Sequence, residues 1–344
     1  MSEKEEILEI LKKQYNNPDI QWPSEINVSN IQIDEINKKI KSVTLTLCKA
    51  AAGLTKKPIN MQKDSACFEG WAVALKATNE HIDIYLDVDG DLPDFAVGKG
   101  HYGRFLYRAL RFSEQYEWFH LCGGDGNSKT LKGAVNQFEK FLKEKKFENN
   151  VPEKEAGTKN MPENIAEEYM ASDKGKSYFL GCLGAKCDDA QNVYRQLPVG
   201  LFLDKKSNDT RIFTGGTSAI DLWTMNGDVL QVVELKADNK MVGIVTEIFF
   251  YSNYIHDFLM NTDVEKGFQL REPPRFRKSE KHRGYDTLYE KRSEIKKIEG
   301  FMLADVYHPL ITPDVLGVLN AGSKKDKIQY FKEEYDFDVT IKQK

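Results

Sequence analysis

The sequence predicts a mixed α/β chain with two domains. Apolar residues recur at helical spacing in some segments and alternate in others, which is typical of helices and strands in one chain. A polar segment at 151–164, which contains Pro152 and Pro162, has the composition of a linker. We therefore predict an α+β domain at 1–150, a linker at 151–164 and a second, α/β domain at 165–344.

Composition and charge fit this class. The chain has 344 residues, of which 40% are hydrophobic and 30% are charged, as in soluble globular proteins. No run reaches the roughly 18 apolar residues of a membrane-spanning helix, and the acidic start MSEKEEILEI lacks the layout of a secretory signal. We expect a cytoplasmic protein without membrane contact. The net charge of −4 gives the whole chain no general attraction for nucleic acid.

The first domain combines both kinds of element. Helical spacing or composition predicts helices at Glu3–Tyr15, Ile33–Ile40 and Lys129–Phe147. Alternation and β-branched residues predict strands at Val43–Ala51, Cys67–Ala77 and His81–Val88, and the aromatic stretch Arg104–Leu121 predicts one or two more.

The second domain has a different rhythm. Its predicted elements, in order, are helices at 165–180 and 187–197, strands at 199–206, 219–226 and 228–237, a helix at 243–260, and a strand at 301–307. Asn226-Gly227 is a strong signal for a hairpin turn. The order is therefore helix, three strands, helix, strand.

Three charged residues lie on this predicted hairpin. A turn centred on Asn226-Gly227 pairs residue i with about 453 − i, so Asp221 would face about Val232. Residues 232, 234 and 236 share one face because strand side chains alternate. We therefore expect Asp221, Glu234 and Lys236 to gather at the end of the sheet away from the turn.

Two carboxylates beside an ammonium suit phosphodiester chemistry. Mg²⁺ commonly binds one or two carboxylates together with waters and a substrate phosphate, and Mn²⁺ can take its place. The lysine can orient or deprotonate the attacking water, or bind the phosphate. The alternative is a structural salt bridge among the same three residues, since charged groups in an apolar strand need partners.

The layout IDLW, NGD and VLQVVELKA followed by a helix resembles the PD-(D/E)xK nuclease superfamily over roughly residues 180–310. The resemblance implies a restriction-endonuclease-like αβββαβ core with a mixed central sheet. It implies that Asp221 and Glu234 are the acids, that Lys236 is the catalytic lysine, and that the Leu235 backbone carbonyl is a further metal ligand. The expected activity is Mg²⁺-dependent cleavage of nucleic acid. Ile220 stands where the motif's name has proline.

Members of this superfamily often carry another acid on the helix before the first strand. The candidates are Glu167, Glu168, Asp188 and Asp189, with the uncharged Gln191 also in a suitable position, and the sequence leaves the choice open. On the helix after the hairpin, Glu247 would support metal-bound water or orient Lys236. It would equally fit a solvated face or a partner for the helix dipole.

A basic stretch follows this helix. Residues 264–299 hold eleven basic and seven acidic side chains, a net charge of +4, which suits either a phosphate-binding face or a solvated loop. The candidate nucleic-acid contacts are Arg271, Arg275, Arg277 and Arg283.

The sequence thus predicts a metal-dependent nuclease, with DNA favoured over RNA as the substrate but the choice between them left open. The alternative is an inactive nuclease-like module that binds nucleic acid or a protein. The first domain would provide a homodimer or partner surface.

Overall fold

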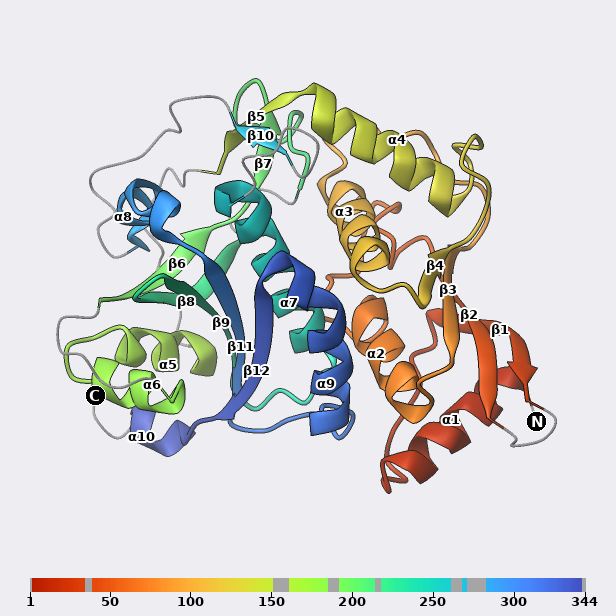
Figure 1. Ribbon diagram of the computed structural model, residues 1–344, viewed down its shortest axis with the longest axis horizontal. Coiled ribbons are helices and arrows are strands. Elements are labelled where there is room, and N and C mark those ends of the chain that lie inside the picture. Colours follow the sequence, from red (N-terminus) through yellow and green to blue (C-terminus); the bar gives the residue numbers. More distant parts are fainter. Residues whose placement is uncertain are drawn as a thin grey trace. The chain divides into compact units, whose positions relative to one another are not determined.

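The computed structural model describes residues 2–34, 39–150, 161–184, 192–213, 218–260, 268–270 and 283–341. The chain forms two compact units (Figure 1). Unit 1 comprises 1–144, 241–246 and 308–323, and unit 2 comprises 145–240, 247–307 and 324–344. The boundary at 144/145 lies close to the predicted one, but two later segments belong to unit 1.

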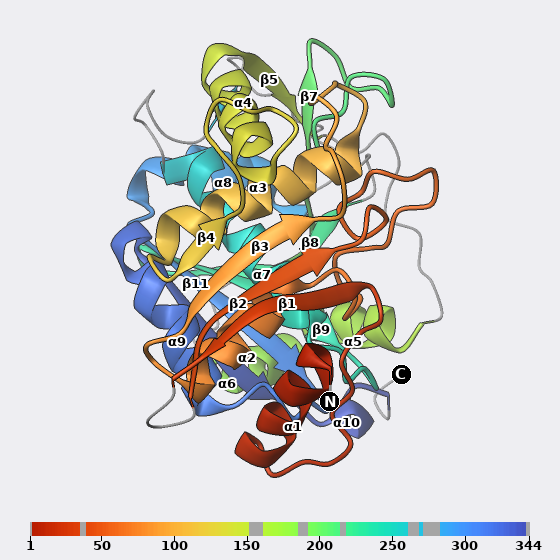
Figure 2. The ribbon, with the colours of Figure 1, turned by 90° about the vertical axis from the view of Figure 1, so that its right-hand side faces the viewer.

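Unit 1 is built on a four-stranded sheet with the order β1-β2-β3-β4. β1 pairs antiparallel with β2, and the other pairs are parallel. Figure 2 looks onto this sheet, with α2 and α3 behind it. The elements are α1 (Glu3–Gln14), β1 (Ile26–Ile33), β2 (Ile40–Leu47), α2 (Phe68–Thr78), β3 (Asp83–Val88), α3 (Gly100–Gln115), β4 (Phe119–Leu121), α4 (Leu131–Glu144) and α9 (Pro313–Ser323).

Two segments of unit 1 that were predicted as strands are helices. Cys67–Ala77 forms most of α2, and Arg104–Leu121 forms most of α3 followed by β4. Residues 68–75 are all buried, so α2 has no polar face there to mark a helical period. The helix predicted at Ile33–Ile40 is also wrong, since its described ends belong to β1 and β2.

Unit 2 contains a three-stranded sheet, β10-β5-β7, and a larger five-stranded sheet. Its strands are β5 (Lys146–Asn149), β6 (Val193–Pro198), β7 (Leu201–Leu203), β8 (Ala219–Asn226), β9 (Val229–Lys236), β10 (Gln269–Leu270), β11 (Lys297–Ala304) and β12 (Ile328–Glu334). Its helices are α5 (Pro162–Met170), α6 (Lys176–Cys182), α7 (Gly243–Ile255), η1 (His256–Met260), α8 (Tyr285–Glu290), η3 (Arg292–Glu294), η4 (Lys324–Asp326) and α10 (Phe337–Ile341). Residues 243–246 of α7 belong to unit 1.

The larger sheet is mixed and has the order β12-β11-β9-β8-β6. β8 pairs antiparallel with both β6 and β9, whereas β11 pairs parallel with both β9 and β12. The predicted hairpin is confirmed. The first strand differs: Val193–Pro198, predicted as the end of a helix, pairs with β8, whereas the strand predicted at 199–206 is reduced to β7 in the small sheet.

The two faces of this sheet are covered differently. On one face Leu222, Val233 and Leu235 pack with residues of α5 and α6, including Met170 and Phe179. The other face receives α7. Its approach to β11 is close, because a Cβ at Gly300 would lie 2.6 Å from Ser252 Oγ.

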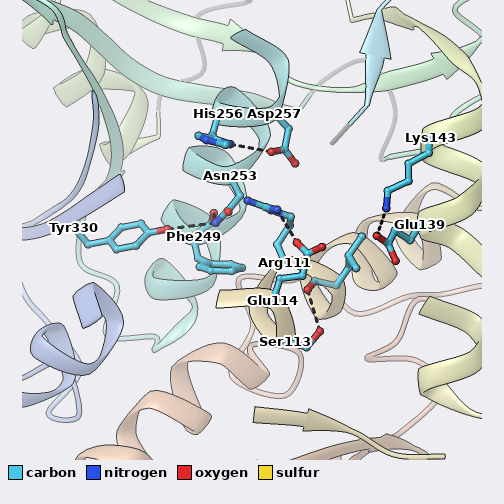
Figure 3. A network of polar contacts seen from close by, with 11 residues as sticks. Arg111, Ser113, Glu114, Glu139, Lys143, Phe249, Asn253, His256, Asp257 and Tyr330 are labelled. Atoms are coloured by element: carbon cyan, nitrogen blue, oxygen red, sulfur yellow. Dashed lines mark hydrogen bonds and ion pairs between the residues drawn. The ribbon is translucent and has the colours of Figure 1, made fainter. Parts of the chain in front are cut away.

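A buried hydrogen bond also holds α7 to β12. Asn253 Nδ2 donates to the Phe249 carbonyl at 2.9 Å and to Tyr330 Oη at 3.4 Å (Figure 3). Asn253 therefore ties the helix to the sheet and limits its rotation. The rest of α7 in unit 2, including Glu247, is fixed over the same face.

The predicted linker is shorter than expected. Residues 162–164 form the first turn of α5, with Pro162 at the start of the helix, where its fixed φ and missing N–H cost nothing. Residues 151–160 lie outside the described ones. In the described parts of the chain, no helix has both the length and the apolar character needed to cross a membrane.

Candidate active site

The hairpin brings the predicted acids closer than the sequence suggested. β8 and β9 pair from Leu222↔Val233 to Asn226↔Val229, so the turn residues are Gly227 and Asp228. Gly227 has φ +61°, which a glycine at the first position of a two-residue turn readily adopts. The predicted turn was therefore wrong by one residue. The observed register places Asp221 opposite Glu234 rather than Val232.

Lys236 is held between two glutamates. Its Nζ lies 2.5 Å from Glu234 Oε1 and 3.0 Å from Glu247 Oε2. Glu234, Lys236 and Glu247 are 3%, 5% and 4% exposed. Asp221 is partly exposed, and its Oδ2 accepts a hydrogen bond from Leu235 N at 2.9 Å. The structure thus brings Asp221, Glu234, Lys236 and Glu247 together, and α7 supplies the fourth.

The ionisation of the acids reflects this crowding. Burial raises the pKa of Asp221 to about 8, opposed by Lys236 and reinforced by Glu167 and Glu247. Burial, together with Asp221 and Glu247, also raises the pKa of Glu234 well above its usual range. Three carboxyl groups thus share one ammonium, and the site favours the protonated forms of Asp221 and Glu234.

Lys236 behaves as an ammonium. Burial alone would lower its pKa, but Glu234, Glu247 and Asp221 outweigh burial and raise the pKa well above the ordinary value. Of the roles considered from the sequence, this favours orienting water or binding phosphate over accepting a proton.

One buried oxygen fits a cation ligand. Glu234 Oε2 has no hydrogen-bond partner among the described residues, and an unpartnered buried carboxylate oxygen is costly. The carboxylates of Asp221 and Glu234 are oxygen donors of the kind that a hard divalent ion prefers, as is the Leu235 carbonyl expected from the sequence. In the described ranges, no three His, Cys, Asp or Glu side chains form a group that could hold a metal. Two carboxylates are therefore the acidic ligands to consider.

Among the candidate helix acids, Glu167 on α5 lies near the site. It is 2% exposed and close enough to Asp221 to raise the pKa of that carboxyl. Its carboxylate accepts from Arg195 Nε at 3.0 Å and from Gln196 Nε2 at 2.7 Å. Arg195 and Gln196 were missed, because only the pairing of β6 with β8 shows that they approach this centre. Asp188, Asp189 and Gln191 lie outside the described residues.

The structure gives no support to Arg283 as a phosphate contact. This residue is 4% exposed, and its Nη1 donates to the Gln196 carbonyl at 2.6 Å. Its own carbonyl accepts from Trp223 Nε1 at 2.8 Å. The side chain is therefore buried in unit 2, away from solvent. Arg271, Arg275 and Arg277 lie outside the described residues.

Comparison of this chain with protein-family models, with curated proteins and with solved structures found no match.

The raised pKa of Asp221 predicts a pH-dependent effect of Asp221→Asn in metal-free buffer. The unfolded carboxyl titrates near pH 3.9, whereas the folded one titrates at about 8. The stability that the protonated Asp221 contributes is therefore fully present below the unfolded pKa. It decreases as pH rises and is lost once pH has passed the folded pKa. Asparagine does not ionise, so the variant does not lose this stability. The free energy of unfolding of Asp221→Asn, relative to that of wild type, should therefore increase between pH 5 and pH 8, by at most about 1.4 kcal/mol per pH unit.

Urea unfolding with a chelator at pH 5, 6.5 and 8 measures this advantage. Asp228→Asn, on the turn of the same hairpin, is the matched control, since Asp228 makes only a half-exposed pair with Lys296. A difference between Asp221→Asn and wild type that stays constant with pH would show that Asp221 ionises normally.

Proposed function

We propose that this chain is a metal-dependent phosphodiesterase that hydrolyses the backbone of nucleic acid, with its centre at Asp221, Glu234 and Lys236. The element order α5, β6, β8, β9, α7, β11 and the mixed sheet agree with a restriction-endonuclease-like core. The proposed site is on the hairpin strands β8 and β9, which is where the resemblance to PD-(D/E)xK nucleases would put it. No comparison with known proteins contributes to this proposal.

A single observation carries the proposal. Two glutamates pair with one buried ammonium, Asp221 lies opposite Glu234 on the hairpin, and one oxygen of Glu234 is buried without a hydrogen bond. A purely structural salt bridge would satisfy each buried oxygen and balance the charges. Near neutral pH the raised pKa values favour the protonated forms of Asp221 and Glu234. A divalent cation would take the place of these protons, because it supplies positive charge and a partner for the free Glu234 oxygen.

The residues have distinct roles in this proposal. Asp221 and Glu234 would hold Mg²⁺, or Mn²⁺ in its place, with the Leu235 carbonyl as a further ligand. The ion would supply charge stabilisation at the phosphate and lower the pKa of a bound water. Glu247 holds the Lys236 ammonium beside this pair, where it can orient water or stabilise negative charge on phosphate oxygens. We expect DNA as the substrate in preference to RNA.

A second function rests on a different observation. Lys236 already has two glutamate partners, as it would in a nuclease-like module that binds nucleic acid or a protein without cleaving. The two functions differ in metal binding. Titration calorimetry with Mn²⁺ should give heat that Asp221→Asn abolishes if the centre is catalytic, and no such heat if the charged cluster is structural.

Cleavage itself tests the proposal. The full chain with Mg²⁺ or Mn²⁺ should degrade DNA or RNA, and a chelator should stop it. Lys236→Ala should lower the rate by about 100-fold or more, since it removes the positive charge beside the phosphate. Lys297→Ala is the control, because Lys297 also pairs with a glutamate two residues away, at 2.9 Å, but on β11. Equal rates for the two variants would reject the assignment.

A further inference from the structure

The carboxylate of Glu167 is fully engaged by two neighbours on β6. Gln196 Nε2 lies 2.7 Å from both Glu167 oxygens, and Arg195 Nε lies 3.0 Å from Oε1. Arg195 Nη1 also pairs with Glu168 at 3.2 Å. We call Arg195 and Gln196 the Glu167 clamp. Hydrogen bonds to a charged group are about twice as strong as neutral ones, so the clamp holds Glu167 firmly.

The backbone of Gln196 is strained. Its φ is +57°, in the left-handed region that costs a residue with a Cβ. Arg195 pairs with Leu222 and Leu197 pairs with Ile220, so this register places Gln196 opposite Asp221. Arg283 Nη1 holds the Gln196 carbonyl at 2.6 Å. A strained residue therefore lies between the helix acid and the first acid of the centre.

The position of Glu167 matters to the centre because Glu167 is bonded at both oxygens to Gln196, which lies opposite Asp221 in the register of β6 with β8. If it were free, it would be the obvious third carboxylate for a cation held by Asp221 and Glu234. The number of carboxylates affects which ion is preferred. Ca²⁺ takes six to eight oxygen ligands and gains affinity with added carboxylates, whereas Mg²⁺ keeps several waters and uses one or two carboxylates.

We propose that the Glu167 clamp withholds this carboxylate from the cation centre and thereby makes the centre select Mg²⁺ or Mn²⁺ over Ca²⁺. Gln196 is then a specificity-determining residue that acts through Glu167. This inference rests on the cation centre of the proposed function, but it concerns the choice of ion and not the cleavage step.

Calorimetric titration of the full chain with Mn²⁺ and with Ca²⁺ tests the clamp without any substrate. Gln196→Gly removes the amide and relieves the positive φ. It should raise the affinity for Ca²⁺ by about tenfold or more, with a smaller change for Mn²⁺. Glu167→Gln combined with Gln196→Gly should lose this gain, because the ligand that the first change released is no longer a carboxylate.

The matched control is Lys327→Gly. Lys327 has φ +56° and is exposed just before β12, so the change relieves the same kind of strain away from Glu167. If wild type binds Mn²⁺ but Gln196→Gly gives the same Ca²⁺ affinity as Lys327→Gly, the clamp does not set ion choice. If Gln196→Gly gains Ca²⁺ affinity and the double variant keeps the gain, Glu167 is not the released ligand and the inference is wrong. If neither ion binds to any variant, the cation centre is absent, which overturns the proposed function and the clamp with it.

Discussion

Glu234→Gln is expected to lower divalent-ion-dependent cleavage by about 1,000-fold or more, equal to about 4 kcal/mol of transition-state stabilisation. Glutamine keeps the shape of the side chain and an oxygen that can accept from Lys236. It removes the negative charge and replaces one carboxylate oxygen with an NH2 group, whose nitrogen is not a ligand for a hard cation. Cleavage rates at saturating Mn²⁺ measure the loss, and calorimetry should show that Mn²⁺ binding weakens in parallel.

The control for this variant lies in the same sheet. Glu299 on β11 pairs with Lys297 at 2.9 Å and accepts from Gln231 Nε2 at 3.0 Å, so it is also a strand glutamate beside a lysine. Glu299→Gln should leave the cleavage rate within about twofold, since effects at sites that share no partner are independent. Comparable losses in both variants would indicate a general effect on the sheet. Retained cleavage in Glu234→Gln would exclude Glu234 as a ligand.

Local signals predicted the hairpin and its residues well. The Asn226-Gly227 turn signal between the segments 219–226 and 228–237 was sufficient, because hairpin pairing depends on neighbouring residues. These signals did not predict the exact register, since a shift of the turn by one residue changes every pairing. That shift decided whether Asp221 faces Val232 or Glu234.

Long-range pairing explains what the sequence did not predict. Gln196 and Arg195 lie in a segment that was predicted as helix, and only the pairing of β6 with β8 brings them to Glu167. Similarly, α2 and α3 were predicted as strands. Their polar groups have partners inside the protein, so these residues do not mark a solvent-exposed face of a helix. Glu69 and Arg108 lie 39 positions apart and are 0% and 2% exposed. In the sequence alone, Glu69 and Arg108 cannot be distinguished from charged residues on the surface, because their pairing is not visible there.

This buried pair in unit 1 is bidentate. Arg108 Nε donates to Glu69 Oε1 at 2.7 Å and Nη2 donates to Oε2 at 2.5 Å. Nη2 also donates to the Ala66 carbonyl at 2.8 Å, and Thr246 Oγ1 donates to Glu69 Oε2 at 2.8 Å. The guanidinium lies 4.9 Å from the ring centre of Phe68. Both carboxylate oxygens of Glu69 and the Nε and Nη2 groups of Arg108 are thus used, so the cost of burying two charges is offset only while both are present.

Arg108→Met should therefore lower the free energy of unfolding by about 3–5 kcal/mol, because it leaves the Glu69 carboxylate buried without a counter-charge. Urea unfolding followed by tryptophan fluorescence measures this, since Trp22, Trp71 and Trp118 belong to unit 1. Adding Glu69→Leu should recover more than half of the loss, as no isolated charge then remains. Lys143→Met, which breaks the surface pair of Lys143 with Glu139 (Figure 3), should change stability by no more than about 0.5 kcal/mol. A loss in Arg108→Met no larger than that of the surface control would mean that water reaches Glu69 and that the pair does not stabilise α2 against α3.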